Sequence, residues 1–347
     1  MRYFVFILVI YIELTSASET SHSAIDHAPI GIMADHFHKQ GESMISLRYD
    51  SMKMNGNIFN GSRIKTQQIL QMHNPLGSMP ATLSVVPNSM DMNMIMFGGM
   101  YGLSDNITLM AMGMFMEKDM NLSSYKPMMS RDLIGNFTTS SSDLSDISVG
   151  VLFKVKESEG NRWHSELTFQ QSLDKNELKD IVLTPMGMNM EMILPYGMQI
   201  GDDSTRLVMG LTNVRNLNDN WILGNQLRGK FVILDDGWSF GDLLEFNTWV
   251  QYEVNSSLSV SSRLKFIDQD GISGNNPLIM APVQTASPNN YGGREVHVGL
   301  GVNFITSILP GHADRFGIEF VMPIEQDKNG LQMETDYQLI VGYQKSF

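Results

Sequence analysis

The chain has 347 residues and carries 24 Lys and Arg against 37 Asp and Glu, which gives a formal net charge of -13. This acidic balance argues against nucleic-acid binding, which normally needs a basic face, so we expect no nucleic-acid partner. Cysteine is absent, which excludes disulfide scaffolds, thiolate metal sites and cysteine nucleophiles. Methionine is the unusual residue, with 28 copies in the chain.

The first residues have the order of an export signal. Arg2 precedes an apolar run over residues 3–12, and small residues follow at positions 15–18. This order predicts a signal peptide over residues 1–18 that is removed on export. Residues 19–42 are then expected to form a separate N-terminal segment.

Beyond residue 42 apolar and polar side chains alternate with a period of two, which indicates β-strands with one face buried. For example, Ile147 and Val149 alternate with Ser148 and Gly150. The segments are long enough to cross a bilayer when tilted. There are twelve of them, over residues 43–54, 90–102, 106–117, 145–157, 162–173, 203–214, 220–233, 242–254, 257–268, 294–306, 314–324 and 333–347.

The connections between these segments alternate in length. The long ones are 55–89, 118–144, 174–202 and 269–293, and two on the same side, 234–241 and 325–332, are of moderate length. Short turns on one rim, long loops on the other and an even strand count are typical of outer-membrane barrels, whereas a soluble sandwich needs neither feature. The sequence therefore predicts an all-β fold, a transmembrane antiparallel up-and-down β-barrel of the outer-membrane type with about twelve strands over residues 43–347. Residues 19–42 would then lie in the periplasm or plug the barrel.

The chain ends on an aromatic residue. Phe347 follows apolar or aromatic side chains at Leu339, Val341 and Tyr343, although Lys345 interrupts the alternation. This ending resembles the C-terminal signal that the barrel-assembly machinery of Gram-negative bacteria recognises. The resemblance implies that machinery and the lipid bilayer as partners, and the outer membrane of a Gram-negative bacterium as the location.

The alternation also assigns methionines to the lumen. If the odd-numbered apolar residues of the early strands face lipid, the even-numbered methionines face inward. The candidate metal ligands among them are Met92, Met94, Met96, Met110, Met112 and Met114. Thioethers are soft ligands that suit Cu(I) or Ag(I). In a second interpretation methionine is a flexible filler that makes an adaptable surface for apolar ligands. In a third, these methionines face lipid.

Charged side chains are expected to line the rest of the lumen. They are Arg48, Lys154, Arg162, His164, Glu166, Arg228, Glu245, Arg263, Glu295, His297 and Glu334. Twelve strands enclose a bore only somewhat wider than that of the filled eight-stranded barrel. These charges therefore form either a structural network of ion pairs or a selectivity filter.

The N-terminal segment contains a second candidate metal site. Asp35, His36 and His38 stand close together, with His27 nearby, and imidazole and carboxylate groups can bind a divalent ion. The alternative is that they are ordinary polar residues of a periplasmic or plugging segment. No G-x-S-x-G motif or phosphate-binding glycine loop is present, so we expect no enzymatic activity.

Four stretches together resemble a known group of proteins. They are H-A-P-I-G-I-M-A-D-H-F-H-K-Q-G-E-S-M-I-S-L-R-Y-D, L-P-Y-G-M-Q-I-G, N-N-Y-G-G-R-E-V and the final L-Q-M-E-T-D-Y-Q-L-I-V-G-Y-Q-K-S-F. They are similar to proteobacterial outer-membrane proteins labelled transporters, and to the barrel family called putative MetA-pathway of phenol degradation. The resemblance covers most of the mature chain. It implies an outer-membrane barrel that takes up apolar or aromatic compounds, and it implies no catalytic residues.

Three functions are consistent with the sequence. The first is a barrel that passes or binds a small solute without a cofactor. The second is an outer-membrane protein that handles copper or silver ions through its methionines and the Asp35, His36 and His38 group. The third is a structural or adhesive barrel whose long loops carry the function.

Overall fold

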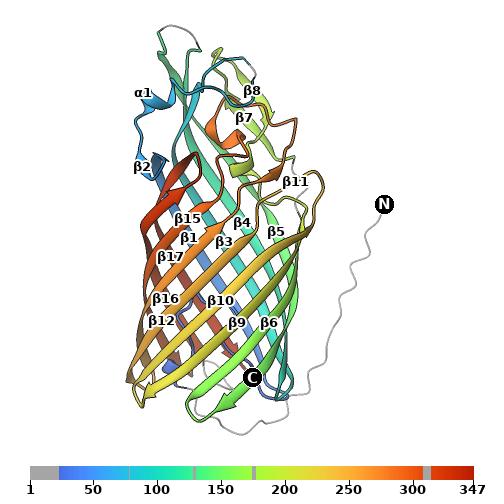
Figure 1. Ribbon diagram of the computed structural model, residues 1–347, viewed down its shortest axis with the longest axis vertical. Coiled ribbons are helices and arrows are strands. Elements are labelled where there is room, and N and C mark those ends of the chain that lie inside the picture. Colours follow the sequence, from blue (N-terminus) through green and yellow to red (C-terminus); the bar gives the residue numbers. More distant parts are fainter. Residues whose placement is uncertain (1–22, 78, 128–129, 174–176, 308–313) are drawn as a thin grey trace.

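The computed structural model describes residues 23–347 except 78, 128–129, 174–176 and 308–313. The predicted signal peptide lies outside the described residues. Within them, twelve long antiparallel strands follow one another around a barrel, and pairing of the last strand with the first closes it (Figure 1). The predicted all-β up-and-down barrel of about twelve strands is confirmed.

The barrel strands are β1 (Ser43–Phe59), β3 (Val85–Ser104), β4 (Ile107–Tyr125), β5 (Leu133–Ser158), β6 (Asn161–Ser172), β9 (Thr205–Asn218), β10 (Trp221–Leu234), β12 (Leu243–Asn255), β13 (Leu258–Gln269), β15 (Gly293–Thr306), β16 (Asp314–Lys328) and β17 (Leu331–Ser346). Each barrel strand pairs with the barrel strands that precede and follow it along the chain.

Two predicted connections are much shorter in the structure. The loop placed at 118–144 covers only residues 126–132, because β4 and β5 continue to pair as far as Tyr125 and Leu133. In this extension polar side chains bond across the strands, as Thr138 Oγ1 does to Asn121 Oδ1 at 2.7 Å. The outward side chains of this extension are polar, whereas Met120 and Leu122 are buried on its inner side, so it lacks the outward apolar face of the predicted strands. The connection placed at 325–332 is a tight turn at residues 329–330, where Gly330 adopts a φ of 61°.

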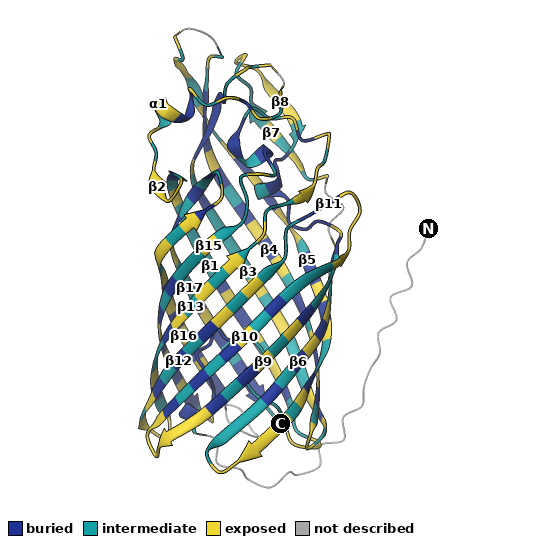
Figure 2. Cartoon of the chain, viewed as in Figure 1, coloured by how far each residue is buried: buried dark blue, intermediate teal, exposed yellow. Residues whose placement is uncertain are grey.

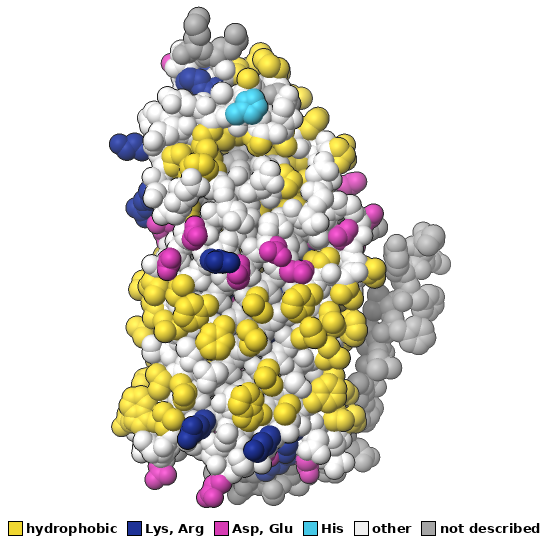
Figure 3. Space-filling model, viewed as in Figure 1, with side chains coloured by type: hydrophobic (Ala, Val, Ile, Leu, Met, Phe, Trp, Pro, Cys, Tyr) yellow, Lys and Arg dark blue, Asp and Glu magenta, His cyan; other side chains and the backbone are white. Residues whose placement is uncertain are grey.

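Apolar side chains face outward from the barrel wall. Leu47, Val149 and Leu300 are 52%, 60% and 61% exposed. On the visible face, hydrophobic side chains gather in a band with charged groups near both of its edges (Figure 3). An outward apolar band of this kind is the arrangement of barrels that span a bilayer.

No helix in the described part of the chain is long and apolar enough to span a membrane.

The loops at the long-loop end fold over the barrel mouth. Their short elements are β2 (Ser62–Arg63), α1 (Thr66–Ile69), β7 (Lys179–Leu183), β8 (Asn189–Ile193), η2 (Tyr196–Met198), β11 (Trp238–Ser239), β14 (Ser273–Gly274) and η3 (Gln284–Ala286). Figure 2 shows buried residues among these loops. Leu194, Tyr196 and Trp238 pack there in one apolar cluster with Met120 and Leu122 of β4. This cluster is the largest apolar core of the described residues, and it lies above the lumen.

Candidate functional site in the barrel interior

The N-terminal segment, residues 23–42, occupies the short-turn end of the lumen. It begins with η1 (Ala24–Asp26), where the Ala24 N–H donates to the Ser256 carbonyl at 2.9 Å, in the turn between β12 and β13. It returns to the same rim, where the Gly41 N–H donates to the Gly102 carbonyl at 2.9 Å. Between these points Ile30 is 2% exposed and packs against Gly317 and Gly342. A Cβ at either glycine would lie less than 3 Å from Ile30, so the absence of side chains there makes room for the segment.

Side chains from several strands hold this segment by its backbone. Gln251 Nε2 donates to the His27 carbonyl at 2.6 Å, and Gln226 Nε2 donates to the Met33 carbonyl at 2.8 Å. His164 Nε2 lies 2.8 Å from the Ala34 carbonyl oxygen. These three strands lie close together in the barrel, and Asn303 of β15 and Thr108 of β4 bond to the segment from other parts of the wall.

Buried ion pairs surround the segment. Arg263 Nε donates to Glu319 Oε1 at 2.8 Å, and the two side chains are 2% and 0% exposed. Glu319 Oε2 also accepts the Gly31 N–H at 2.8 Å, which connects the ion pair to the N-terminal segment. Arg228 binds Glu166 through two nitrogens at 2.8 and 2.9 Å. Around the segment, charged lumen side chains therefore bond to one another and to the segment.

The remaining predicted charges lie in three places. At the short-turn rim, Arg162 lines a small cavity, while Lys154 Nζ lies 2.8 Å from Glu157 and 4.7 Å from the centre of the Phe37 ring. Arg48 contacts the sulfur of Met33. Further toward the loops, Glu245 pairs with Lys265 at 2.8 Å, and Glu295 pairs with His297 at 3.2 Å and Lys328 at 3.7 Å.

Glu334 does not line the lumen as the alternation predicted. It pairs with Arg63 of β2, whose side chain is 75% exposed, while its neighbours Met333 and Thr335 line the interior cavity. In the pairing of β1 with β17, Lys53 lies opposite Tyr337 and Met54 lies opposite Thr335. Asp336 is therefore an extra residue on β17. A bulge of this kind reverses the faces of the strand beyond it, and only the pairing reveals it.

The predicted methionine ligands all lie on the inner face of β3 and β4. Their outward neighbours Ile95, Phe97 and Phe115 are 42%, 49% and 38% exposed. The strand register puts methionines opposite one another in successive pairs, which are Met90 with Met120, Met94 with Met116, Met96 with Met114 and Met100 with Met110; Met92 faces Lys118 and Met112 faces Gly98. Residues directly opposite in an antiparallel pair have neighbouring side chains. The thioethers therefore form a continuous sector along the wall, which we call the methionine sector and which Met44, Met52 and Met54 of β1 extend.

A cavity of about 530 Å³ lies between the methionine sector and a charged wall. Met52, Met54, Met90, Met92, Met116 and Met120 line one side, and Asp146, Arg206, Lys230, Glu245 and Lys265 are among the residues on the other. Lys118 Nζ donates to the Gly197 and Gln199 carbonyls at 3.1 and 2.6 Å, which ties the loop between β6 and β9 to the barrel wall. This inner cavity is therefore amphipathic, and the loops cover it.

A second cavity, of about 760 Å³, lies outside the first and is mostly apolar. It is bounded by the extended ends of β3, β4 and β5, the β7–β8 hairpin and the loop between β13 and β15. Leu122, Phe137, Val182 and Leu194 line it together with Met120, which is 1% exposed and also lines the inner cavity. The two cavities therefore meet at the Met120 side chain. The sequence did not predict this outer cavity, because four separate loops and strand ends build it.

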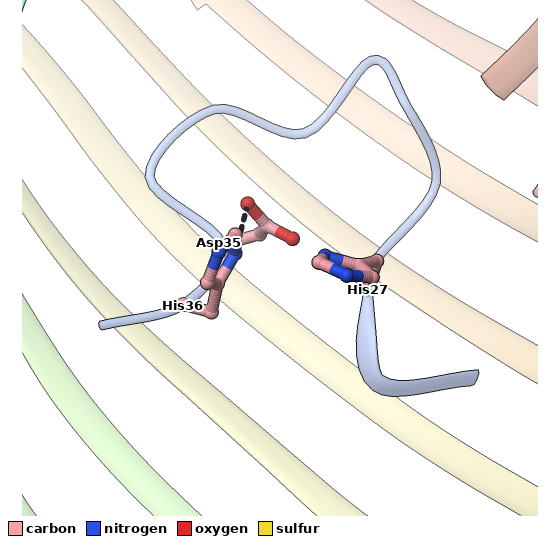
Figure 4. A group of neighbouring side chains, drawn as sticks. All are labelled: His27, Asp35 and His36. Carbon is pink, nitrogen blue, oxygen red and sulfur yellow. Dashed lines mark ion pairs between the residues drawn. The ribbon is translucent and has the colours of Figure 1, made fainter. Parts of the chain in front are cut away.

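The predicted Asp35, His36 and His38 group is brought together, and the structure adds His27 to it. Ligand atoms of His27, Asp35 and His36 lie within 4.8 Å of one another (Figure 4). The rings of His27 and His38 lie 5.1 and 4.9 Å from the His36 ring, centre to centre. The chain reversal between residues 27 and 38 brings His27, which the sequence places nearby, against Asp35 and His36.

Two carboxylates control the charge in this group. Burial on its own would raise the pKa of Asp35, but the facing His36 holds it well below its usual range, and Arg315 and His27 act in the same direction. The contact with His38 lowers the pKa of Glu42 to about 2. Burial lowers the pKa of His38. Asp35 and Glu42 are therefore ionised beside imidazoles.

Comparison with known proteins shows a likeness in fold. No family model and no curated protein matches the chain, so the resemblance to the phenol-degradation family stays a prediction. An outer membrane channel from Pseudomonas putida F1 is similar to the chain with a TM-score of 0.56 and 11% identity, covering 90% of this chain and 98% of the channel. The toluene transporter TodX of P. putida has a TM-score of 0.40 and 11% identity, over 88% and 90% of the two chains. The first likeness shows that the chain has the fold of an outer-membrane channel.

Proposed function

We propose that the protein is an outer-membrane barrel that binds and passes small apolar solutes. The observation that carries this proposal is the pair of cavities, one apolar and one lined by methionine, that meet at Met120. The fold is that of an outer-membrane channel, and the outward apolar band suits a bilayer. We infer the outer membrane of a Gram-negative bacterium as the location, recognition of the Phe347 end by the barrel-assembly machinery, and no enzymatic activity.

The outer cavity has the size and lining to take an apolar solute first. A dry apolar cavity of about 150 Å³ is enough to bind benzene, and this cavity is several times larger. Apolar surface transferred from water into such a site gains roughly 25 cal/mol per Å². A small aromatic compound would therefore concentrate beside Leu122, Phe137 and Val182.

The inner cavity suits the next step. Methionine side chains are flexible and polarizable, so the sector on β1, β3 and β4 can adapt to solutes of different shape. The charged residues opposite can accept a polar group on the same solute. Passage toward the periplasm would require the N-terminal segment to move, because it fills the short-turn end of the lumen.

Solute uptake by proteoliposomes tests this proposal. Wild-type protein should admit toluene or phenol faster than protein-free liposomes do. Met120→Trp should slow this uptake several-fold, because the larger side chain fills the junction of the two cavities. Met322→Trp is the matched control, since Met322 is 43% exposed on the outer face of β16. Equal uptake by both variants, or no uptake by the wild type, would contradict the proposal.

A second candidate function is the handling of Cu(I) or Ag(I), which the register of the methionine sector favours. Paired thioethers along β3 and β4 present several soft ligands to one lumen. The test is a titration with Ag(I). Replacing Met94, Met96 and Met114 by Leu preserves volume and should weaken binding by at least tenfold. The same replacement of Met186, Met188 and Met190, which are exposed in the β7–β8 region, should leave it unchanged. Equal affinities in the two triple variants would eliminate this candidate.

A further inference from the structure

We propose that His27, His36 and His38, with Asp35, form a binding site for one divalent transition-metal ion of the Zn²⁺ or Cu²⁺ class. The site lies in a cavity of about 220 Å³ at the short-turn end of the lumen, which all four residues line. Asp35 also borders the methionine sector, through a second small cavity that Met44, Met100 and Met110 line, but the site does not depend on the proposed solute. Its function is to fasten the N-terminal segment inside the barrel.

The separation of the donors is close to what one ion requires. Ligand atoms of His27, Asp35 and His36 lie within 4.8 Å of one another. Two nitrogens bound at about 2.0–2.1 Å to one Zn²⁺ can be no more than about 4.2 Å apart. Small side-chain rotations would therefore bring these three donors to one ion, and the His38 ring lies beside them, 4.9 Å from the His36 ring, centre to centre. Figure 4 shows Asp35 and His36 in contact, with the His27 ring on the other side of the carboxylate.

In two of these rings one nitrogen faces a carboxylate, the kind of partner that a metal-bound histidine usually has. His36 Nδ1 lies 2.9 Å from Asp35 Oδ1, and His38 Nδ1 lies 3.7 Å from Glu42 Oε2. A carboxylate at one ring nitrogen orients the imidazole and leaves the other nitrogen for the metal. In this arrangement Asp35 either orients His36 or ligates the ion itself.

The Nε2 atoms of the same two rings are buried without a hydrogen-bond partner among the described residues. These atoms are His36 Nε2 and His38 Nε2, and the whole His38 residue is only 5% exposed. An unpaired polar atom in the interior is unfavourable, and binding to an ion would remove this penalty. His164, in contrast, uses its Nε2 at the Ala34 carbonyl and is not a ligand in this site.

Carboxylates outnumber lysine and arginine side chains in the lining of this cavity, and the buried Arg315 also acts on Asp35. The acidic lining residues are Asp26, Asp35, Glu42 and Glu157, and the basic ones are Lys39 and Arg162. Imidazole nitrogen with carboxylate oxygen is a donor set for Zn²⁺, Cu²⁺ or Ni²⁺ rather than for the Cu(I) or Ag(I) that thioethers prefer. The two kinds of site in this protein therefore differ in the ions they would select.

The place of the ligands in the chain explains the proposed function. His27 lies before the turn that carries Ile30 into the lumen, and His36 and His38 lie after it. An ion bound to all three would cross-link the two ends of this turn. The closed loop would hold Ile30 against Gly317 and Gly342 more firmly than hydrogen bonds alone.

The test is calorimetric titration of the full mature chain, freed of metal with EDTA in detergent, with Zn²⁺ and with Cu²⁺. We expect one ion per chain with micromolar or tighter affinity. His36→Ala with His38→Ala should weaken binding at least tenfold. His73→Ala is the control, because His73 is exposed in the loop between β1 and β3. Affinity unchanged in the double variant, or the absence of saturable binding, would overturn the proposal.

A spectroscopic measurement on the wild type makes the test independent of variant folding. Electron paramagnetic resonance of the Cu²⁺-loaded chain should show hyperfine coupling to more than one imidazole nitrogen. A spectrum with oxygen ligands alone would place the ion elsewhere and overturn the proposal. Neither result bears on toluene uptake, so the proposed function can fail or stand separately.

Discussion

At the scale of single residues, the barrel interior contains charged side chains that are buried as ion pairs. Arg263 and Glu319 are almost completely buried, and each has further partners, namely Asn247 Oδ1 at 3.1 Å and the Gly31 N–H at 2.8 Å. Such a pair adds little net stability compared with an apolar replacement, but removing one partner leaves a buried charge unpaired. The two residues therefore tolerate single substitutions poorly.

Glu319→Gln should destabilise the folded barrel by about 3–5 kcal/mol, because Arg263 keeps its charge and loses its counter-ion. Urea unfolding in detergent or lipid, followed by the gel shift between folded and unfolded forms, measures this change. Asp91→Asn is the matched control. Asp91 pairs with Lys53 at 2.7 Å, but the two side chains are 43% and 42% exposed, so its loss should cost less than about 1 kcal/mol. Equal effects of the two substitutions would show that burial does not control this pair.

At the scale of elements, the N-terminal segment is the part that closes the lumen. Its backbone carbonyls accept hydrogen bonds from β10 and β12, while Ile30 and Ile32, each 2% exposed, supply apolar contacts with the wall. The strand positions next to Ile30 are glycines, so the fit at this point depends on the isoleucine and on the space beside it. A change in that single side chain should be visible in the behaviour of the whole segment.

Ile30→Ala should loosen the segment, because deleting a buried isoleucine side chain costs about 2–5 kcal/mol of packing. In planar bilayers we expect more frequent or larger openings than in the wild type. Ile45→Ala is the control, since Ile45 is 53% exposed on the outer face of β1. If both variants conduct as the wild type does, the segment is not the element that closes the lumen.

At the scale of the whole molecule, the strand positions could be predicted because every strand meets the same two environments. One face of each strand contacts the surroundings of the barrel and the other contacts its interior, so the alternation repeats along the chain in all twelve strands. The prediction was wrong where this contrast ends. Above the apolar band, the outward faces of β4 and β5 are polar, and their pairing continues through residues that were assigned to a loop.

The candidate site could be predicted only in part, and particular residues show why. Met94 and Met96 were placed on the inner face correctly by counting along one strand. Glu334 was misplaced because a bulge on β17 changes the count, and that bulge exists only in the pairing with β1. Met120 was not expected to join two cavities, since the second wall of the outer cavity comes from the β7–β8 hairpin and the loop between β13 and β15.

The sequence by itself determined the all-β barrel, the number of its strands and the side of the early strands that carries the methionines. These properties follow from local alternation, because neighbouring residues on a strand point in opposite directions. Only the tertiary structure decided that residues 23–42 enter the lumen, that His27 joins Asp35, His36 and His38, and that the loops enclose an apolar cavity. The first and third depend on contacts between residues far apart in the chain, and the second depends on a turn of the N-terminal segment. A periodic pattern within one strand encodes none of them.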